Sequence, residues 1–412
     1  MKKITCAACA MGACIGLVGT ARAQSSVTLY GQTDIDVTYA NNTQTAGKSA
    51  SGKPVGSSQV GMYDDGTSGL SSSRWGLKGV EDLGGGLKAI FNLENGFNLN
   101  AGSSQQGGDL FGRQSWVGLT SDSYGRLTLG RQGDTSVEFV SPLTFQWTHG
   151  NASLHPADYD DLEFTRHLNN MIKYLSPSYN GFQFGGMYSL GGVAGNFTQN
   201  QIWSVGARYT GGALSLAASI IDAKDPNFSE YASNPGSSTT GNNMGSPGSE
   251  TAPASNPAIA GFASASYQRT VTAAATYLLG DALLGLEYSN AQFGGLGSIA
   301  SLNTMNYTGS TTLSTISASV RYNVTPAFNL GTSYDYTHGG SVGQKGSATY
   351  QQINVVAGYF LSKATEVYVT GAFEHASGTD SLGQPAVAVI GYLSPSSTDK
   401  ELVFSMGIKH TF

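Results

Sequence analysis

The feature that most constrains this chain is an alternation of apolar and polar residues that recurs in segments of about ten residues. In the segment 27–37, apolar residues such as Val27 and Leu29 occupy odd positions, whereas Asp34 and Asp36 occupy even ones. A period of two is that of a β-strand with one apolar and one polar face. About ten such residues cross a bilayer as a tilted strand. A soluble β-sandwich alternates in the same way, so this pattern alone leaves both architectures open.

The connections between these segments alternate between tight turns and long polar loops. Turns such as Gly84-Gly85-Gly86 and Gly280-Asp281 contain residues that favour chain reversal. The long connections are 41–72, 99–110, 133–165, 191–200, 223–262, 292–310, 338–348 and 376–399. Short turns at one rim and long loops at the other are typical of an up-and-down membrane barrel, so this regularity favours the barrel.

We therefore predict an all-β fold, a 16-stranded antiparallel up-and-down transmembrane β-barrel. The expected strands are 27–40, 73–83, 87–98, 111–121, 125–132, 168–178, 181–190, 201–210, 213–222, 263–278, 282–291, 311–323, 328–337, 349–361, 364–375 and 400–412. An even number in this range leaves an aqueous lumen. The Ser- and Gly-rich stretch 223–262 could be an interdomain linker, but the strand pattern resumes after it. We expect one domain over 24–412, with 223–262 as a long extracellular loop.

The N-terminus has the pattern of a cleaved export signal over residues 1–23. The basic pair Lys2-Lys3 precedes an uncharged run, and residues 21–23 have the small residues of a cleavage site. The run is shorter than the about 20 residues that a spanning helix needs. A lipoprotein motif ending at Cys14 is the alternative, although the mature chain would lack an obvious role for such an anchor.

The cysteines and the charge exclude several kinds of site. All three cysteines, Cys6, Cys9 and Cys14, lie inside the expected signal, so the mature chain has neither disulfides nor Cys-ligated metals. The signal also removes three basic residues, which leaves 18 basic residues against 27 acidic ones. This balance argues against a nucleic-acid partner, whose binders usually carry a basic stripe. We expect no cofactor.

Five segments resemble the Gram-negative general (diffusion) porins of the betaproteobacterial type. They follow the family's order along the mature chain and are 72–89 (SSRWGLKGVEDLGGGLKA), 110–114, 129–132, 169–177 and 407–412. The resemblance implies a barrel in the outer membrane of a Gram-negative bacterium, with its third loop folded into the lumen as a constriction. It implies a water-filled channel for passive diffusion of ions and small hydrophilic solutes.

The resemblance also implies partners. We expect a homotrimer that contacts outer-membrane lipid and lipopolysaccharide. The terminal segment, with Gly407, His410 and Phe412, resembles the signal that the outer-membrane insertion machinery reads.

Charged residues define a candidate constriction. If the third loop, 133–165, folds inward as the resemblance implies, its carboxylates form the negative side, namely Asp158, Asp160, Asp161 and Glu163; otherwise they belong to a solvated acidic loop. Apolar strand neighbours should face lipid, because a charge there costs about 2–4 kcal/mol at the midplane. This parity turns four cations inward, namely Arg74, Lys78, Arg208 and Arg321. Arg113 joins them through its family position.

Two positions leave alternatives open. Arg131 shares parity with Leu127 and Leu129, so either a bulge re-aims it or it lies at a protein contact. The family often has an arginine two residues before its Asn-Asn pair. That position is His167 here, and Arg166 is one residue off, so either residue could take the family role.

Two other functions compete with general diffusion. A substrate-selective channel of the same fold would use stacked lumen aromatics, for which Tyr30, Tyr368 and Trp147 are candidates. An outer-membrane hydrolase needs a nucleophile with a base, or a metal cluster, whereas the six histidines are scattered and fit no such motif. We expect neither catalysis nor a metal site. The sequence leaves the ion preference open, because the acidic mature chain favours cations but much of its negative charge can lie in the loops.

Overall fold

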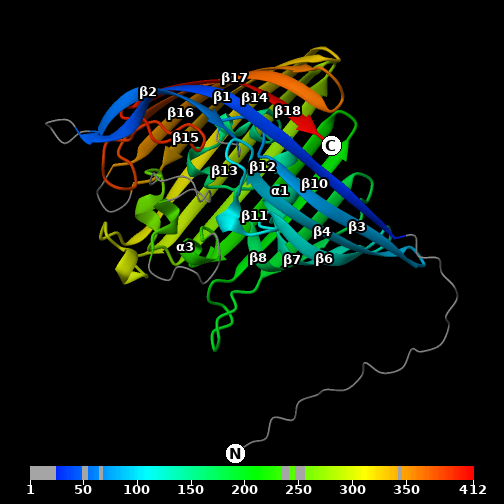
Figure 1. The fold of residues 1–412 in the computed structure, drawn as a ribbon. Helices are drawn as coiled ribbons and strands as arrows, with labels where there is room; N and C mark the ends of the chain where they lie inside the picture. Colours follow the sequence, from blue (N-terminus) through cyan, green and yellow to red (C-terminus); the bar gives the residue numbers. More distant parts are fainter. Residues whose placement is uncertain (1–24, 49–53, 65–67, 233–240, 246–255, 342–345) are drawn as a thin grey trace, which may run out of the picture.

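The structure, a computed structural model, describes residues 25–48, 54–64, 68–232, 241–245, 256–341 and 346–412. Figure 1 shows one sheet rolled into a barrel, with short helices in its interior and at its loop end. The expected signal, 1–23, lies outside the described residues, as do parts of the loop 223–262.

Sixteen strands of the described chain form the wall, each antiparallel to its neighbours. They are β1 (Ser26–Lys48), β3 (Arg74–Gly84), β4 (Leu87–Asn98), β6 (Gln114–Ser121), β7 (Gly125–Gln132), β8 (Leu168–Leu175), β9 (Phe182–Ser189), β10 (Ile202–Gly211), β11 (Leu214–Lys224), β12 (Tyr267–Leu279), β13 (Ala282–Leu296), β14 (Gly309–Thr325), β15 (Phe328–Gly339), β16 (Ala348–Phe360), β17 (Thr365–Gly378) and β18 (Lys400–Thr411). The barrel closes because β1 pairs with β3 along one edge and with β18 along the other. The predicted 16-stranded antiparallel barrel is confirmed.

The two faces of the wall follow the alternation in the sequence. On β16, Ile353 and Val355 are exposed on the outer face, whereas Gln352 and Asn354 are buried on the inner face. In lipid every backbone group needs an internal partner, and a closed barrel supplies one through its strand ladders. Among the described residues, no helix is both long and apolar enough to cross a membrane.

In the described part of the chain, two further strands lie outside the predicted set. β5 (Ser103–Ser104) pairs with the end of β4. β2 (Pro54–Tyr63) pairs with the extended outer half of β1, so the long connection predicted over 41–72 contains a hairpin that the sequence did not predict. Gly and Ser residues are frequent in this segment, so it shows no clear alternation of apolar and polar residues. The two strands nevertheless pair as a hairpin, because each supplies backbone hydrogen-bond partners to the other.

The wall is interrupted between β2 and β3. Both strands pair with the same edge of β1, so the segment between them leaves the ladder. Its residues 68–73, which follow the undescribed stretch 65–67, turn inward: Leu70 packs with Phe145 and Tyr368 in one buried cluster. Ser68 donates to the Asp36 carboxylate on the inner face of β1.

Loop 3, which we define as residues 133–167, connects β7 to β8 and contacts inward-facing residues across the barrel. Its helices are α1 (Thr135–Phe139), η2 (Ser141–Leu143), α2 (Gln146–His149), η3 (Asn151–Ser153) and η4 (Pro156–Asp158). Thr135 Oγ1 lies 2.7 Å from Ser219 Oγ on β11, and Tyr159 donates to Thr315 on β14. The other short helices are η1 (Gln106–Gly108), α3 (Pro226–Ser229), η5 (Asn243–Gly245), η6 (Ala260–Phe262) and η7 (Ala300–Leu302).

Candidate functional site

A polar cavity of about 410 Å³ lies between loop 3 and the inner wall. Its lining comes from segment 68–73, β3, the residue before β6, loop 3, the end of β16 with the turn that follows it, β17 and β18. Four lining residues are cations, namely Arg74, Arg113, Lys363 and Lys409. Two are acidic, namely Glu163 and Glu366.

Arg74 and Arg113 share one buried carboxylate. Glu94 on β4 accepts from Arg113 Nε at 2.8 Å, and its other oxygen lies 3.9 Å from Arg74 Nε. Tyr30 donates to the same carboxylate at 2.8 Å. A single Glu94 therefore orients two guanidinium groups, so the pair keeps a net positive charge.

Local features of the sequence make room for this pair. Gly96 lies opposite Arg74 in the β3–β4 ladder, and a Cβ there would come within 3.1 Å of Arg113 Cδ. Arg74 Nη1 also donates to Ser71 Oγ and to the Ser72 carbonyl, at 3.2 and 3.3 Å. The interruption of the wall before β3 thus supplies two acceptors for the Arg74 side chain.

The structure separates the four predicted loop carboxylates. Three are buried away from the cavity, each with partners of its own: Asp158 accepts from Thr165, Asp160 pairs with His155, and Asp161 accepts from the Arg166 N–H. Because these three carboxylates are buried, they do not face the cavity as the predicted negative side of the constriction would. A carboxylate that is removed from water is costly unless it has hydrogen-bond or ion-pair partners. Residues of loop 3 itself provide these partners for Asp158, Asp160 and Asp161.

Glu163 is the carboxylate of loop 3 that lines the cavity together with Arg74 and Arg113. Burial raises the pKa of Glu163 well above its usual range, and the negative charges of Asp158 and Glu287 raise it further. Glu163 is therefore easier to protonate than an ordinary carboxyl group, and its negative charge depends on pH.

Arg166 and His167 point to different surroundings. Arg166 Nε lies 3.0 Å from Glu230 Oε1 and its guanidinium stacks 4.8 Å from the Tyr231 ring, so it joins loop 3 to the segment after β11. His167 packs edge-on against Phe164 at 4.2 Å. Burial lowers the pKa of His167 well below its usual range, and the nearby positive charge of Arg113 lowers it further. His167, rather than Arg166, belongs to the surroundings of the cavity arginines.

The other predicted cations lie at three separate places on the inner wall. Arg321 on β14 donates from Nη1 to Thr148 Oγ1 at 2.7 Å and from Nη2 to the Leu143 carbonyl at 3.3 Å. Lys78 Nζ lies 5.1 Å from the centre of the Tyr30 ring. Arg208 contributes to the electrostatic field at Glu138 of α1.

The sequence did not predict that Glu138 of α1 pairs with two cations of the barrel wall. Glu138 pairs with Arg126 Nη2 at 2.9 Å and with Lys173 Nζ at 3.1 Å. These residues are 12 and 35 positions from Glu138, and only the closed barrel brings β7, β8 and loop 3 together. Of the three candidate aromatics, Trp147 lines the cavity, whereas Tyr30 and Tyr368 donate to Glu94 and Asp34 on the wall.

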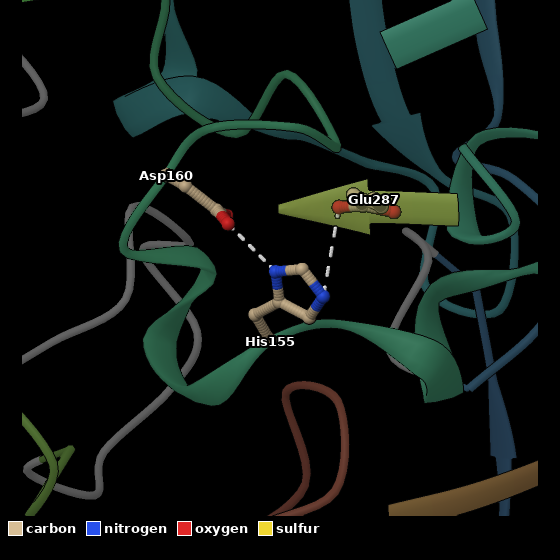
Figure 2. Close-up of side chains that lie close together, drawn as sticks. All are labelled: His155, Asp160 and Glu287. Carbon is tan, nitrogen blue, oxygen red and sulfur yellow. Dashed lines mark hydrogen bonds and ion pairs between the residues drawn. The ribbon is translucent and has the colours of Figure 1, made fainter. Parts of the chain in front are cut away.

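Loop 3 is also fastened to the wall through a buried histidine (Figure 2). His155 Nδ1 lies 2.6 Å from Asp160 Oδ2, and Nε2 lies 3.0 Å from Ser317 Oγ and 3.6 Å from Glu287 Oε1. Burial opposes a charged ring, but the Asp160 and Glu287 carboxylates outweigh it and raise the pKa of His155 to about 10. His155 is therefore an imidazolium at neutral pH.

The same three residues are close enough to be considered as metal ligands, since their ligand atoms lie within 4.8 Å of one another. The histidine, however, lies between the carboxylates and turns one ring nitrogen toward each (Figure 2). A protonated ring has no lone pair for an ion. The arrangement fits an ion pair across loop 3 and β13 better than a metal centre.

The predicted assembly residues lie where the barrel closes. Phe412 and Gly31 exchange two backbone hydrogen bonds of 3.0 Å. The Phe412 ring covers Gly31, because a Cβ at Gly31 would come within 2.6 Å of that ring. Gly407 lies under Tyr368, and His410 contacts Thr365 on the neighbouring β17.

The family profile described as "Gram-negative porin" matches residues 7–379. This chain belongs to the Gram-negative porins. An outer membrane porin protein of Bordetella pertussis is 36% identical over 236 residues, which cover 53% of this porin and 59% of the relative. Outer membrane porin protein 32 of Delftia acidovorans is 38% identical over 180 residues, 42% of this porin and 46% of the relative. This porin thus spans about half the length of these relatives.

Solved structures agree with the fold. A structure described as an anion-selective porin from Comamonas acidovorans has a TM-score of 0.66 at 21% identity, covering 94% of this porin and 100% of that chain. The family and the barrel place the protein in the outer membrane of a Gram-negative bacterium. Its relatives are channels rather than enzymes.

Proposed function

We propose that this porin forms a water-filled channel through which ions and small hydrophilic solutes diffuse passively, with a preference for anions. The observation that carries the proposal is the charged lining of the cavity beside loop 3. A wall charge within about 10 Å acts on every passing ion at 0.1 M salt, so such a lining sets the preference of the pore.

The balance of charges in that lining supports the anion preference. Its four cations stand against Glu163 and Glu366, and Glu94 lies behind the two arginines. Asp158, Asp160 and Asp161 are buried within loop 3, where partners of their own offset part of their charge. The overall acidity of the chain therefore does not predict the sign of the field at the constriction.

Each residue of the proposed constriction has a distinct role. Arg74 and Arg113 attract anions to one side, and Glu163 stands on the loop side as a carboxylate whose charge varies with pH. Arg321 holds loop 3 from the far wall. These roles need no catalytic step and no bound cofactor.

Channel activity itself is tested with purified protein in liposomes, by measuring swelling in isosmotic solutions of sugars of increasing size. The proposal expects fast swelling with the smallest sugars and a gradual decline with size. Swelling confined to one sugar would instead favour a substrate-selective channel. Protein-free and heat-denatured samples provide the baseline.

We further propose that the porin assembles as a homotrimer and that the outer-membrane insertion machinery folds it. The resemblance of its sequence segments to the family supports the trimer, and the terminal Phe412 on the closing strand supports recognition by the insertion machinery. Native mass measurement in detergent tests the trimer, and a monomeric mass under mild conditions would refute it.

A further inference from the structure

Three side chains that carry oxygen atoms form a row across β16, β17 and β18, near the loop end of the barrel. Gln352 lies directly opposite Glu374 in the β16–β17 ladder, and Glu374 lies directly opposite Glu401 in the β17–β18 ladder. All three are buried on the inner face, with exposed fractions of 3%, 1% and 0%. Opposite side chains on one face of a sheet have Cβ atoms about 4.5–5.5 Å apart, so these three are close enough to direct oxygens to one point.

The final loop, which we define as residues 379–399, covers this row. Its Val389 N–H donates to Glu374 Oε1 at 2.8 Å, and its Ile390 N–H donates to Glu401 Oε2 at 3.1 Å. The Ile390 side chain is fully buried in a cluster with apolar residues of β17 and β18. One oxygen of each carboxylate is thus held by two successive N–H groups of the loop, and the apolar cluster keeps water away from the pair.

The negative charge of the two carboxylates has no partner among the described residues. The charged groups that act on Glu374 are Glu401 and Asp335, and both are negative. Against Glu401 the described chain brings a backbone N–H and no cation. The adjacent Lys400 has the opposite strand parity and is exposed. Because a buried charge is costly unless it is paired, the row lacks a positive charge that a bound cation would supply.

Two oxygens of the row, Gln352 Oε1 and Glu401 Oε1, are buried without a hydrogen-bond partner. The orientation of the Gln352 amide is fixed, because its Nε2 donates to the Ala152 carbonyl at 2.6 Å and to Asn354 Oδ1 at 2.7 Å. Both free atoms are therefore acceptors. A water molecule satisfies such acceptors but leaves the charge of the carboxylates uncompensated. Free acceptors beside two carboxylates fit a hard cation, which binds oxygen ligands.

We propose that Gln352, Glu374 and Glu401 bind one Ca²⁺ ion, which fastens the final loop to the wall at the mouth of the barrel. Ca²⁺ accepts about six to eight oxygens in flexible geometry, whereas Mg²⁺ demands an octahedron and keeps several waters, which suits a buried row less well. The three residues lie on separate strands and form no local motif, so the absence of a metal site that we expected from the sequence did not take this row into account. The proposal does not depend on the channel function or on its ion preference.

The test is equilibrium dialysis of radioactive Ca²⁺ with the full-length porin, refolded in detergent and first treated with EDTA. We expect one retained ion per chain. Glu374→Gln with Glu401→Gln keeps the oxygens that accept from the final loop but removes both charges, so this double variant should lose the ion. Asp399→Asn is the matched control and should keep it. Asp399 is an acidic residue of the same loop, but its side chain is 55% exposed and pairs with His375.

Hydrogen exchange of the wild-type porin is a second measurement that needs no variant. The N–H groups of Val389 and Ile390 should exchange more slowly in Ca²⁺ than in EDTA, because the ion holds the carboxylates that accept from them. A wild type that retains no ion would overturn the proposal, since the pair then holds a proton or water instead. An ion that the double variant retains, or that Asp399→Asn loses equally, would overturn it too, as would exchange that Ca²⁺ leaves unchanged. Heat-modifiable migration on gels checks that each variant is folded.

Discussion

Arg321 on β14 donates a hydrogen bond of 2.7 Å from Nη1 to Thr148 Oγ1 in loop 3. Arg321 also donates a hydrogen bond of 3.3 Å from Nη2 to the Leu143 carbonyl of the same loop. Strand parity predicted that Arg321 faces inward, but its partners come from another part of the chain. The residue acts on the pore by fixing loop 3 as well as by its charge.

Replacing Arg321 by Gln should loosen loop 3, because hydrogen bonds to a charged group contribute about 1.5–3 kcal/mol. We expect more frequent closures and greater current noise in single-channel recordings. Lys78→Gln provides the control, since Lys78 is an inward cation that lies over Tyr30. Equal noise in the two variants would show that Arg321 does not anchor the loop.

The ion pair of His155 predicts a pH-dependent stability. Its pKa is raised to about 10 from 6.5, so the stabilisation is fully present below pH 6.5 and is lost as the pH rises through 10. His155→Gln should lower stability by about 3–5 kcal/mol at pH 6, the usual effect of breaking a buried pair. Thermal unfolding in detergent at pH 6 and pH 10 should show the gap to wild type closing. A constant gap would contradict the ion pair.

Glu163 predicts a pH-dependent ion preference. Its pKa is raised by burial and by Asp158 and Glu287, so raising the pH adds a negative charge to the cavity that is absent in acid. The anion preference of the wild type should fall as the pH rises. In Glu163→Gln this dependence should be much weaker, whereas Lys78→Gln, which removes an inner-wall charge outside the cavity lining, should keep it. Reversal potentials measured across a salt gradient between pH 5 and 9 test this prediction. An anion preference that does not change with pH in the wild type would contradict it.

Phe412 predicts an assembly defect. Deleting it removes two backbone bonds to Gly31 and the ring over that glycine, at the seam where the barrel closes. Folded protein in the outer membrane should fall far more than total synthesis does, as measured by heat-modifiable migration of membrane fractions. Phe412→Tyr should insert almost normally. If the deletion inserts as well as wild type, Phe412 is only a residue of the aromatic girdle.

Much of the barrel could be predicted from the sequence because the wall repeats one local rule. A strand with one face in lipid must alternate, so the sixteen wall strands and the inward parity of Arg74 are visible in the residues. The bulge considered for Arg131 is also present, as a register shift between Gly130 and Gln132. There Arg131 donates to the Asn169 side chain.

Loop 3 could not be predicted in this way, because its partners are set by the closed barrel. Asp160 was expected to face the lumen if loop 3 folds inward, yet it is buried and pairs with His155 five residues away, whose other ring nitrogen contacts Ser317 on β14. Nothing in the local sequence separates it from Glu163, which lines the cavity. The hairpin of β1 and β2 was not predicted for another reason. Its many Gly and Ser residues weaken the alternation of apolar and polar side chains by which a strand is recognised.

The reversal potential of the wild-type porin in a planar bilayer tests whether the constriction of the aqueous pore favours anions. In a gradient of potassium chloride near 0.1 M, we expect a sign that shows chloride crossing more readily than potassium. Arg74→Ala should reduce this preference, whereas Arg269→Ala on the outer face should leave it unchanged. In molar salt, where screening shortens to about 3 Å, the effect should shrink. A wild-type pore that prefers potassium, or an anion preference that Arg74→Ala leaves unchanged at low salt, would contradict an anion-selective constriction built on Arg74.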